Sequence, residues 1–214
     1  MTDSNDSRLS PAHPRRRLNK NDYVRINIGQ NYWEALVADV QDEKVKEVLS
    51  RYCVNIVKMV KSGNGLVISG GRGVGKTMAA VAVLKEAVRR GFTAYFVTHG
   101  ELCDLQFNDK VFGDGSDGVM VSQKLREAEV LVIDGINEPF FVDKRFGPRH
   151  LETAVSQRNA RRLTTIITTR AAKEIKKNED LFDVISERMF PLTINGSNKR
   201  DLIRQALFSD VVGE

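Results

Sequence analysis

The sequence predicts an α/β fold in which a parallel sheet of five strands carries helices on both faces. Apolar runs alternate with stretches of helical periodicity along the chain, which is the pattern of strands joined by crossover helices. One strand-to-helix junction, residues 70–77, reads Gly-x4-Gly-Lys-Thr, the phosphate-binding loop of P-loop nucleotide triphosphatases. A length of 214 residues with 29% charged residues fits one domain and a short appendage.

The N-terminal region, residues 1–22, is expected to be a flexible basic arm ahead of a single ATPase domain over residues 23–214. The arm is polar, carries an arginine triplet at 15–17 and offers almost nothing to bury. It has no apolar segment of the secretory kind, and no long apolar run follows, so we expect a cytoplasmic protein with no membrane contact. Cys53 and Cys103 lack partner spacing, and with the scattered histidines they make no metal motif.

The elements of the first half follow from periodicity and breakers. Residues 23–33 alternate weakly and predict an extended segment, and residues 45–60 repeat at helical spacing. A glycine-containing break at 61–65 precedes the strand at 66–69. A helix at 78–90, ended by Gly91, leads to a second strand at 92–98.

The second half continues the alternation. Residues 100–129 are mixed, with a polar Gly/Asp loop flanked by short helices, and residues 130–133 form a fully apolar strand. A helix at 150–162 should turn Leu151, Ala154 and Val155 inward and leave Arg158, Arg161 and Arg162 elsewhere. Further elements are expected as a strand at 164–169, a helix at 175–190, a strand at 191–194 and a helix at 199–208.

The phosphate loop carries the strongest functional signal. Its residues are Gly70, Gly71, Arg72, Gly73, Val74, Gly75, Lys76 and Thr77, with Met78 opening the helix. The glycines let backbone N–H groups turn inward around an anion, and the helix points its positive dipole end at the same place. Lys76 would reach the β- and γ-phosphates, and the Thr77 hydroxyl would hold Mg²⁺. The sequence therefore predicts ATP and Mg²⁺ as ligands.

Three further groups are candidates for the same site. Asp134 ends an apolar strand, which places a carboxylate beside the phosphate loop as a magnesium ligand, although an acid can also simply cap a strand. The strand at 164–170 ends in hydroxyls and a cation that could reach the γ-phosphate, or its threonines only face a polar side. Arg188 lies near a helix end, where it could act in trans on a neighbour's nucleotide or be an ordinary surface residue.

The charge distribution leaves two interpretations open. The net charge is +5, and residues 144–200 hold thirteen Lys or Arg against six Asp or Glu. Such a surface is either a solvated face or an electrostatic footprint for nucleic acid. Charge alone does not separate them.

Together these residues resemble the AAA+ helicase loaders of the DnaC/DnaI type and the related IstB-type transposition ATPases. The resemblance spans roughly residues 23–208. It is carried by the phosphate loop, residues 78–102, Val-Leu-Val-Ile-Asp at 130–134, Thr-Thr-Ile-Ile-Thr-Thr-Arg at 164–170, Ser-Glu-Arg-Met-Phe at 186–190, and Arg200. It implies an AAA+ type P-loop fold.

The resemblance also implies roles for single residues. Lys76, Thr77 and Asp134 take the phosphate and metal roles, and Thr169 and Arg170 stand at the sensor-one position. Arg188 resembles the arginine finger that reaches the neighbouring subunit, and Arg200 the sensor-two arginine. An insertion after the second strand lines a channel for single-stranded DNA in this family, so residues 100–129 supply candidates for that contact: Phe107, Lys110, Phe112, Lys124 and Arg126.

Three departures from the family pattern qualify its implications. Gly135 stands where the family has a second acid that activates water, and Glu138 is the nearby substitute, so we expect weak hydrolysis. The sensor-one position, commonly Asn, is Arg170. Only the basic arm and the entry segment stand where such loaders usually have a separate helicase-binding domain. Either the usual docking mode does not apply, or this is a compact, phage-encoded version that docks through its arm.

The function expected first is that of an ATP-dependent helicase loader. It would oligomerise through its ATP interface, bind single-stranded DNA, and place or open the replicative ring helicase during DNA replication. The alternative is an IstB-type helper that binds duplex DNA and a transposase. A third alternative, a small-molecule kinase, is disfavoured because the sequence shows no compact arginine-rich lid. A fourth, a nucleotide-gated adaptor without catalysis, remains an alternative because of Gly135.

Overall fold

One parallel sheet forms the centre of the molecule. The computed structural model describes residues 15–103, 123–138, 141, 148–198 and 201. Its strands are β1 (Gly65–Gly70), β2 (Ala94–Thr98), β3 (Val130–Ile136), β4 (Thr164–Thr169) and β5 (Met189–Ile194). They lie in the order β2-β3-β4-β1-β5, and neighbouring strands are parallel. The predicted five-stranded parallel sheet is confirmed.

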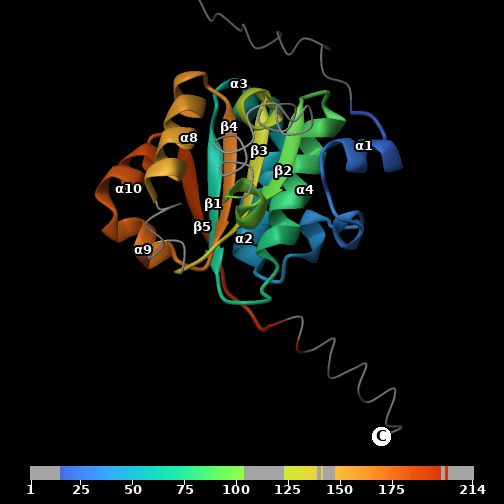
Figure 1. Ribbon diagram of the computed structural model, residues 1–214. Helices are drawn as coiled ribbons and strands as arrows, with labels where there is room; N and C mark the ends of the chain where they lie inside the picture. The colour runs from blue at the N-terminus through green and yellow to red at the C-terminus, as the bar shows by residue number, and fades with distance from the viewer. Residues whose placement is uncertain (1–14, 104–122, 139–140, 142–147, 199–200, 202–214) are drawn as a thin grey trace, which may run out of the picture.

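Helices cover both faces of this sheet (Figure 1). They are α1 (Lys20–Arg25), α2 (Glu43–Val54), α3 (Ile56–Lys61), α4 (Lys76–Arg89), α8 (Pro148–Ala160), α9 (Ala172–Lys177) and α10 (Glu179–Ser186), with short 3-10 turns at Gln30–Tyr32 and Val37–Asp39. The helices α2, α3 and α4 pack on one face, and α8, α9 and α10 on the other. Among the described residues, no helix combines the length and apolar character that crossing a bilayer requires.

The strands divide their side chains between two apolar cores. In β1, Leu66 and Ile68 join the core under α2, α3 and α4, while Val67 joins the core under α8 and α10. Successive strand residues point to opposite faces, so burial on both faces requires an uninterrupted apolar run. This explains why β1 and β3 read as continuous apolar stretches in the sequence.

The segment after the arm differs from the extended conformation expected for residues 23–33. It contains α1, which begins with a reciprocal cap: the Asn19 side chain accepts from the Asp22 N–H at 3.1 Å, and the Asn19 N–H donates to the Asp22 carboxylate at 2.9 Å. Such caps satisfy N–H groups that a helix start otherwise leaves unpaired. The alternation of apolar residues carries no information about this cap, so it did not predict the helix.

The end of the predicted arm is part of the folded domain. The Arg16 N–H donates to the Arg89 carbonyl at the end of α4 at 2.9 Å, and the Arg15 guanidinium donates to Glu86 at 3.0 Å. Residues 15–22 are therefore anchored, in contrast to the expected flexible arm through residue 22. Residues 1–14 lie outside the described part of the chain.

Two predicted helices are each divided by an asparagine. The helix expected at 45–60 becomes α2 and α3, which meet at Asn55, and the helix expected at 175–190 becomes α9 and α10, which meet at Asn178. The Asn178 side chain accepts from the Leu181 N–H at 3.0 Å and so starts α10 anew. The last residues of the second helix belong to β5. The helix predicted at 199–208 lies outside the described residues, as does most of the mixed stretch at 100–129.

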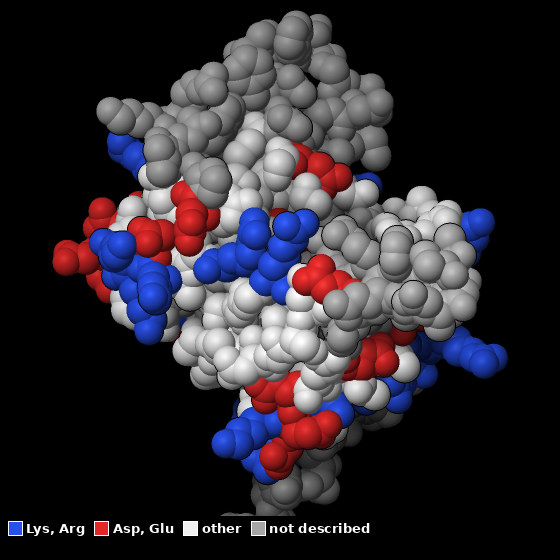
Figure 2. All heavy atoms as spheres, turned by 90° about the horizontal axis from the view of Figure 1, so that it is seen from below, with Lys and Arg blue, Asp and Glu red and all other residues white. Residues whose placement is uncertain are grey.

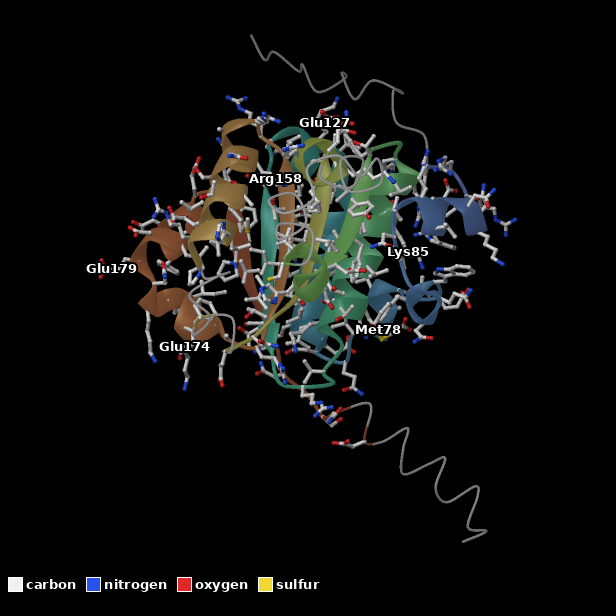
Figure 3. The ribbon with its side chains drawn as sticks, viewed as in Figure 1. Met78, Lys85, Glu127, Arg158, Glu174 and Glu179 are labelled. Atoms are coloured by element: carbon white, nitrogen blue, oxygen red, sulfur yellow. The ribbon has the colours of Figure 1, made fainter. Side chains whose placement is uncertain are left out.

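Arg158 is a clear correction, because the helix periodicity left it outside the core and the structure buries it to 3% exposure. Its guanidinium donates to the Thr165 hydroxyl and to the carbonyls of Leu125, Ala128 and Thr164, at 2.7–2.9 Å. Burial lowers the pKa of this arginine. Figure 3 shows Arg158 between α8 and the sheet. The side chain thus ties α8 to β4 and to the segment that leads into β3.

Candidate nucleotide-binding site

The phosphate loop joins β1 to α4 at the carboxyl edge of the sheet, and glycines shape it. Gly73 and Gly75 have φ of 75° and 98°, a region that other residues rarely adopt. A Cβ on Gly73 would lie 1.6 Å from the Asn198 side-chain oxygen, so a larger residue would have to displace that side chain in addition to adopting a left-handed backbone. Val74 is buried in the core under α4 and fixes the loop to the domain. The loop therefore has a defined, glycine-dependent shape.

Lys76 is the first residue of α4, and its side chain contacts this loop. Its ammonium donates to the carbonyls of Gly70 at 3.1 Å and Gly71 at 2.5 Å. The first N–H groups of a helix lack intrahelical partners and favour anions. A cation, unpaired helix N–H groups and left-handed glycines thus meet at one point, a donor set that fits phosphate.

Asp134 lies beside the loop and joins two hydroxyls. Its Oδ1 accepts from Thr77 at 2.8 Å and from Thr168 at 2.6 Å. Hard oxygen donors of this kind are what Mg²⁺ prefers, so Thr77 and Asp134 fit as its holders next to a triphosphate. The predicted partners Thr77 and Asp134 are in contact, although they stand 57 residues apart in the sequence.

Gly135 follows at an irregularity of β3. Its φ is 87°, its N–H donates to the Thr168 hydroxyl at 2.9 Å, and the β3–β4 register shifts between Ile133 and Ile136. A Cβ at this position would meet no atom within 4 Å, so a side chain has space but the backbone disfavours it. A residue other than glycine at position 135 would therefore have space for its side chain but a strained backbone.

Thr168 is the functional candidate that sequence reasoning missed. The two residues predicted for this role have other surroundings. Thr169 is fully buried and donates to the Ile136 carbonyl at 2.9 Å, and Arg170 is exposed just beyond β4. Only the strand order reveals the contact, because Ile133 pairs with Ile167 and so places Thr168 beside Asp134. Knowing that β3 and β4 are neighbours would have identified it.

The remaining predicted residues of this edge surround the loop. Arg72, Arg170 and Glu138 are exposed, and Met78 packs against the core under α4. Figure 2 shows this face from below, with Lys and Arg side chains gathered near its middle. Asp and Glu side chains lie around this group on the same face, so the basic side chains form a local cluster there.

Arg188 lies at the opposite edge of the sheet. Its carbonyl accepts from the Gly65 N–H at the start of β1, while the phosphate loop follows the end of that strand. A six-residue strand spans roughly 17 to 20 Å, so Arg188 is remote from the nucleotide site of its own chain. Its guanidinium donates to the Ser62 carbonyl at 3.2 Å, and its side chain is 27% exposed.

The other candidates are placed only in part. Arg200, Phe107, Lys110 and Phe112 lie outside the described residues. Lys124 and Arg126 are exposed, and the Lys124 ammonium lies 5.5 Å from the centre of the Tyr95 ring.

The fold and this site define a P-loop nucleotide triphosphatase of the AAA+ type. A family model described as IstB-like ATP binding protein matches residues 37–174, so the chain belongs to this family of ATP-binding proteins.

Solved structures share the fold at low sequence identity. A structure titled as the DnaC helicase loader is 22% identical with a TM-score of 0.63, covering 78% of this chain and 100% of that one. A DnaI structure is 19% identical with a TM-score of 0.59, covering 80% and 93%. The replication initiator DnaA bound to AMPPCP and single-stranded DNA is 15% identical with a TM-score of 0.61, covering 80% and 52%. No curated protein matches the sequence.

Proposed function

We propose that this protein is an ATP-dependent loader of a replicative ring helicase, acting in the cytoplasm on single-stranded DNA. The observation that carries the proposal is the contact of Thr77 and Thr168 with one oxygen of Asp134 beside a glycine-shaped loop. It is supported by membership of the IstB-like ATP-binding family and by a fold similar to the full length of the DnaC structure.

The residues of the site divide the work of binding. The loop N–H groups and Lys76 bind the β- and γ-phosphates, and Lys76 exchanges its two carbonyl partners for phosphate oxygens. Thr77 and Asp134 hold Mg²⁺, which supplies charge neutralisation at the phosphates when it is bound. Thr168 orients the Asp134 carboxylate. Thr169, Arg170 and Arg200 remain predicted sensors of the nucleotide state.

The distance between Arg188 and the phosphate loop supports self-association as part of this proposal. An arginine at the opposite edge of the sheet can contact a nucleotide only if that nucleotide is bound to an adjacent subunit. ATP at one subunit would then be contacted by Arg188 of the next, and the assembled subunits would grip single-stranded DNA and hold the helicase ring open. Nucleotide loss or hydrolysis would release them.

The first experiment measures assembly and partner choice together. Size-exclusion chromatography with light scattering should show ATP-dependent oligomers, and Lys76→Ala and Arg188→Ala should both abolish them. Only Lys76→Ala should also abolish ATP binding by the monomer. Affinity capture with ATP should retain a replicative helicase. Capture of no helicase, with assembly intact, would refute the loader function and leave the ATP-gated assembly standing.

Slow hydrolysis is the second testable part of the proposal. Gly135 offers no carboxylate to activate water, and the exposed Glu138 is the substitute closest in sequence. Gly135→Glu should raise ATP turnover by about tenfold to a hundredfold if its carboxylate acts as the base, despite the left-handed backbone. Gly135→Gln is the matched control and should not. Wild-type turnover in the usual AAA+ range, abolished by Asp134→Ala, would show that the glycine does not limit hydrolysis.

The second candidate function is a transposition helper, and the family match favours it specifically. Such a protein would bind duplex DNA and a transposase in place of single-stranded DNA and a helicase. Capture of a transposase, together with ATP-dependent preference for duplex DNA, would support this alternative over the loader.

A further inference from the structure

The C-terminal end of α4 carries a cluster of arginines contributed by three segments. Arg89 is the last residue of α4 and Arg90 follows it, one arginine comes from α1, and three come from the segment before α1. We call it the arginine surface, and its members are Arg15, Arg16, Arg17, Arg25, Arg89 and Arg90. Figure 1 shows α1 beside the upper part of α4, away from the phosphate loop.

Two buried carboxylates organise this surface. Glu86 is 6% exposed and lies 3.0 Å from Arg15, 3.3 Å from Arg89 and 3.5 Å from Arg90. The single negative charge of Glu86 therefore positions three guanidinium groups but neutralises the charge of only one.

Asp22 positions two further arginines, Arg16 and Arg25, on the other side of the surface. It is 7% exposed and receives both ends of the Arg16 guanidinium at 2.7 Å, with Arg25 at 3.6 Å. Five of the six arginines thus contact these two acids, so the cluster carries more positive charge than the acids neutralise. A neighbouring hollow beside Arg25 is lined by one further base and one acid, Lys124 and Glu127.

The arginine surface also encloses a hollow. A cavity of about 420 Å³ is lined by Arg15, Arg16, Arg17 and Arg89, with Leu18 and Tyr23. Two of its arginine side chains are exposed, Arg15 by 59% and Arg16 by 41%, and Arg25 outside the hollow is 67% exposed. Each guanidinium has five N–H donors, so donors remain for a ligand after the pairing with carboxylates.

We propose that the arginine surface binds the phosphate backbone of nucleic acid, independently of ATP. Guanidinium groups match phosphate geometry, and the hollow gives one phosphate several donors at once. The charge continues beyond the hollow to Arg25 and Arg90, which suits a polymer with repeated phosphates better than a single small anion.

This surface is distinct from the nucleotide site. The helix α4 has 14 residues and spans about 20 Å between the two, so ATP need not be present for the arginines to be in place. Nucleic acid held here would extend the contact of the protein with DNA to the opposite end of the domain.

The test uses nucleotide-free protein and fluorescently labelled 20-nucleotide DNA, single-stranded and duplex, in anisotropy titrations at several salt concentrations. The triple variant Arg15→Gln/Arg17→Gln/Arg25→Gln should bind about tenfold more weakly near 0.1 M salt and lower the salt slope by about two to three. Arg17→Gln alone leaves the contacts of Glu86 and Asp22 in place and should give a smaller loss in the same direction.

The matched control is Lys173→Gln/Lys176→Gln/Lys177→Gln, which removes the same charge from exposed residues of α9 across the sheet. It should bind as the wild type does. Equal weakening of both triple variants would overturn the proposal, because net charge would then explain binding. Displacement of DNA by poly-glutamate as effectively as by unlabelled DNA would also overturn it in favour of an acidic protein partner. Failure of helicase capture leaves this measurement unaffected.

Discussion

The two ends of helix α4 recognise anions by different means. At its N-terminal end the phosphate loop presents backbone N–H groups, left-handed glycines and one lysine. At its C-terminal end the arginine surface presents only side chains, arranged by Glu86 and Asp22. The first site is formed by the backbone and the second by ion pairs.

The helix dipole explains this difference. The N-terminal end of a helix carries a partial positive charge and unpaired N–H groups, so it binds phosphate with little help from side chains. The C-terminal end carries a partial negative charge, which stabilises cationic side chains but repels a bound anion. Anion binding at that end therefore needs several arginines in excess of their acids. The nucleotide site should depend on backbone shape, and the arginine surface on charge and salt.

The largest effect is expected from the loop glycine that the structure encloses most tightly. Gly73→Ala brings a Cβ against Asn198 in a left-handed conformation and should weaken ATP binding on the order of a hundredfold, as expected when two phosphate hydrogen bonds are lost. Gly71→Ala is the control, because its Cβ would meet Val74 at an ordinary 3.7 Å. Calorimetric titration with ATP measures both. Comparable affinities would mean that backbone shape does not govern this site.

Thr168→Val should lower Mg²⁺-dependent ATP turnover by about tenfold, since the Asp134 carboxylate loses one of its two hydroxyl donors. Nucleotide binding without Mg²⁺ should be unchanged, which separates this positioning role from a loss of folding. Thr164→Val is the control, because the Thr164 hydroxyl is buried without a hydrogen-bond partner in the described structure. A loss in both variants would assign the effect to strand packing.

At the other end of the helix, Glu86→Gln should lower the free energy of unfolding by about 1 to 3 kcal/mol. The three arginines around it would lose their common negative charge in a partly buried place. Urea denaturation followed by circular dichroism measures the change. Glu47→Gln, whose exposed partner is Arg51, should change stability by well under about 1 kcal/mol. Equal effects would mean that Glu86 does not organise the surface.

The smallest effect on stability is expected from lowering the pH. The hydrogen bond from Arg16 lowers the pKa of Asp22 from 3.8 to about 2. Because the folded pKa lies below the unfolded one, this contribution to stability is complete above about pH 4 and is lost as the pH falls toward 2. The fluorescence of Trp33, which stacks on Tyr23 of α1 at 5.3 Å, should report the loosening.

The acid step has its own control. Arg16→Gln removes the main cause of the lowered pKa, so the Trp33 signal should change at a pH closer to 4. Arg51→Gln, which pairs only with the exposed Glu47 among the described residues, should leave the step where it is. An unchanged step in Arg16→Gln would show that Asp22 does not anchor α1 through this pair.

The sequence alone determined the sheet and the nucleotide site in outline. Continuous apolar runs identify strands buried on two faces, and the Gly-Lys-Thr junction identifies the loop, because both depend on residues that are close together in the chain. The extended form expected for residues 23–33 was wrong, since the cap between Asn19 and Asp22 favours a helix locally.

Only the tertiary structure decided which distant side chains meet. The contact of Thr168 with Asp134 depends on β3 and β4 being neighbours. The burial of Arg158 depends on four acceptors from two segments, and the contact of Arg15 with Glu86 depends on the chain before α1 lying against α4. Periodicity reports which face of an element is apolar, but the burial of a polar side chain such as Arg158 is stabilised by hydrogen-bond partners from elsewhere in the chain.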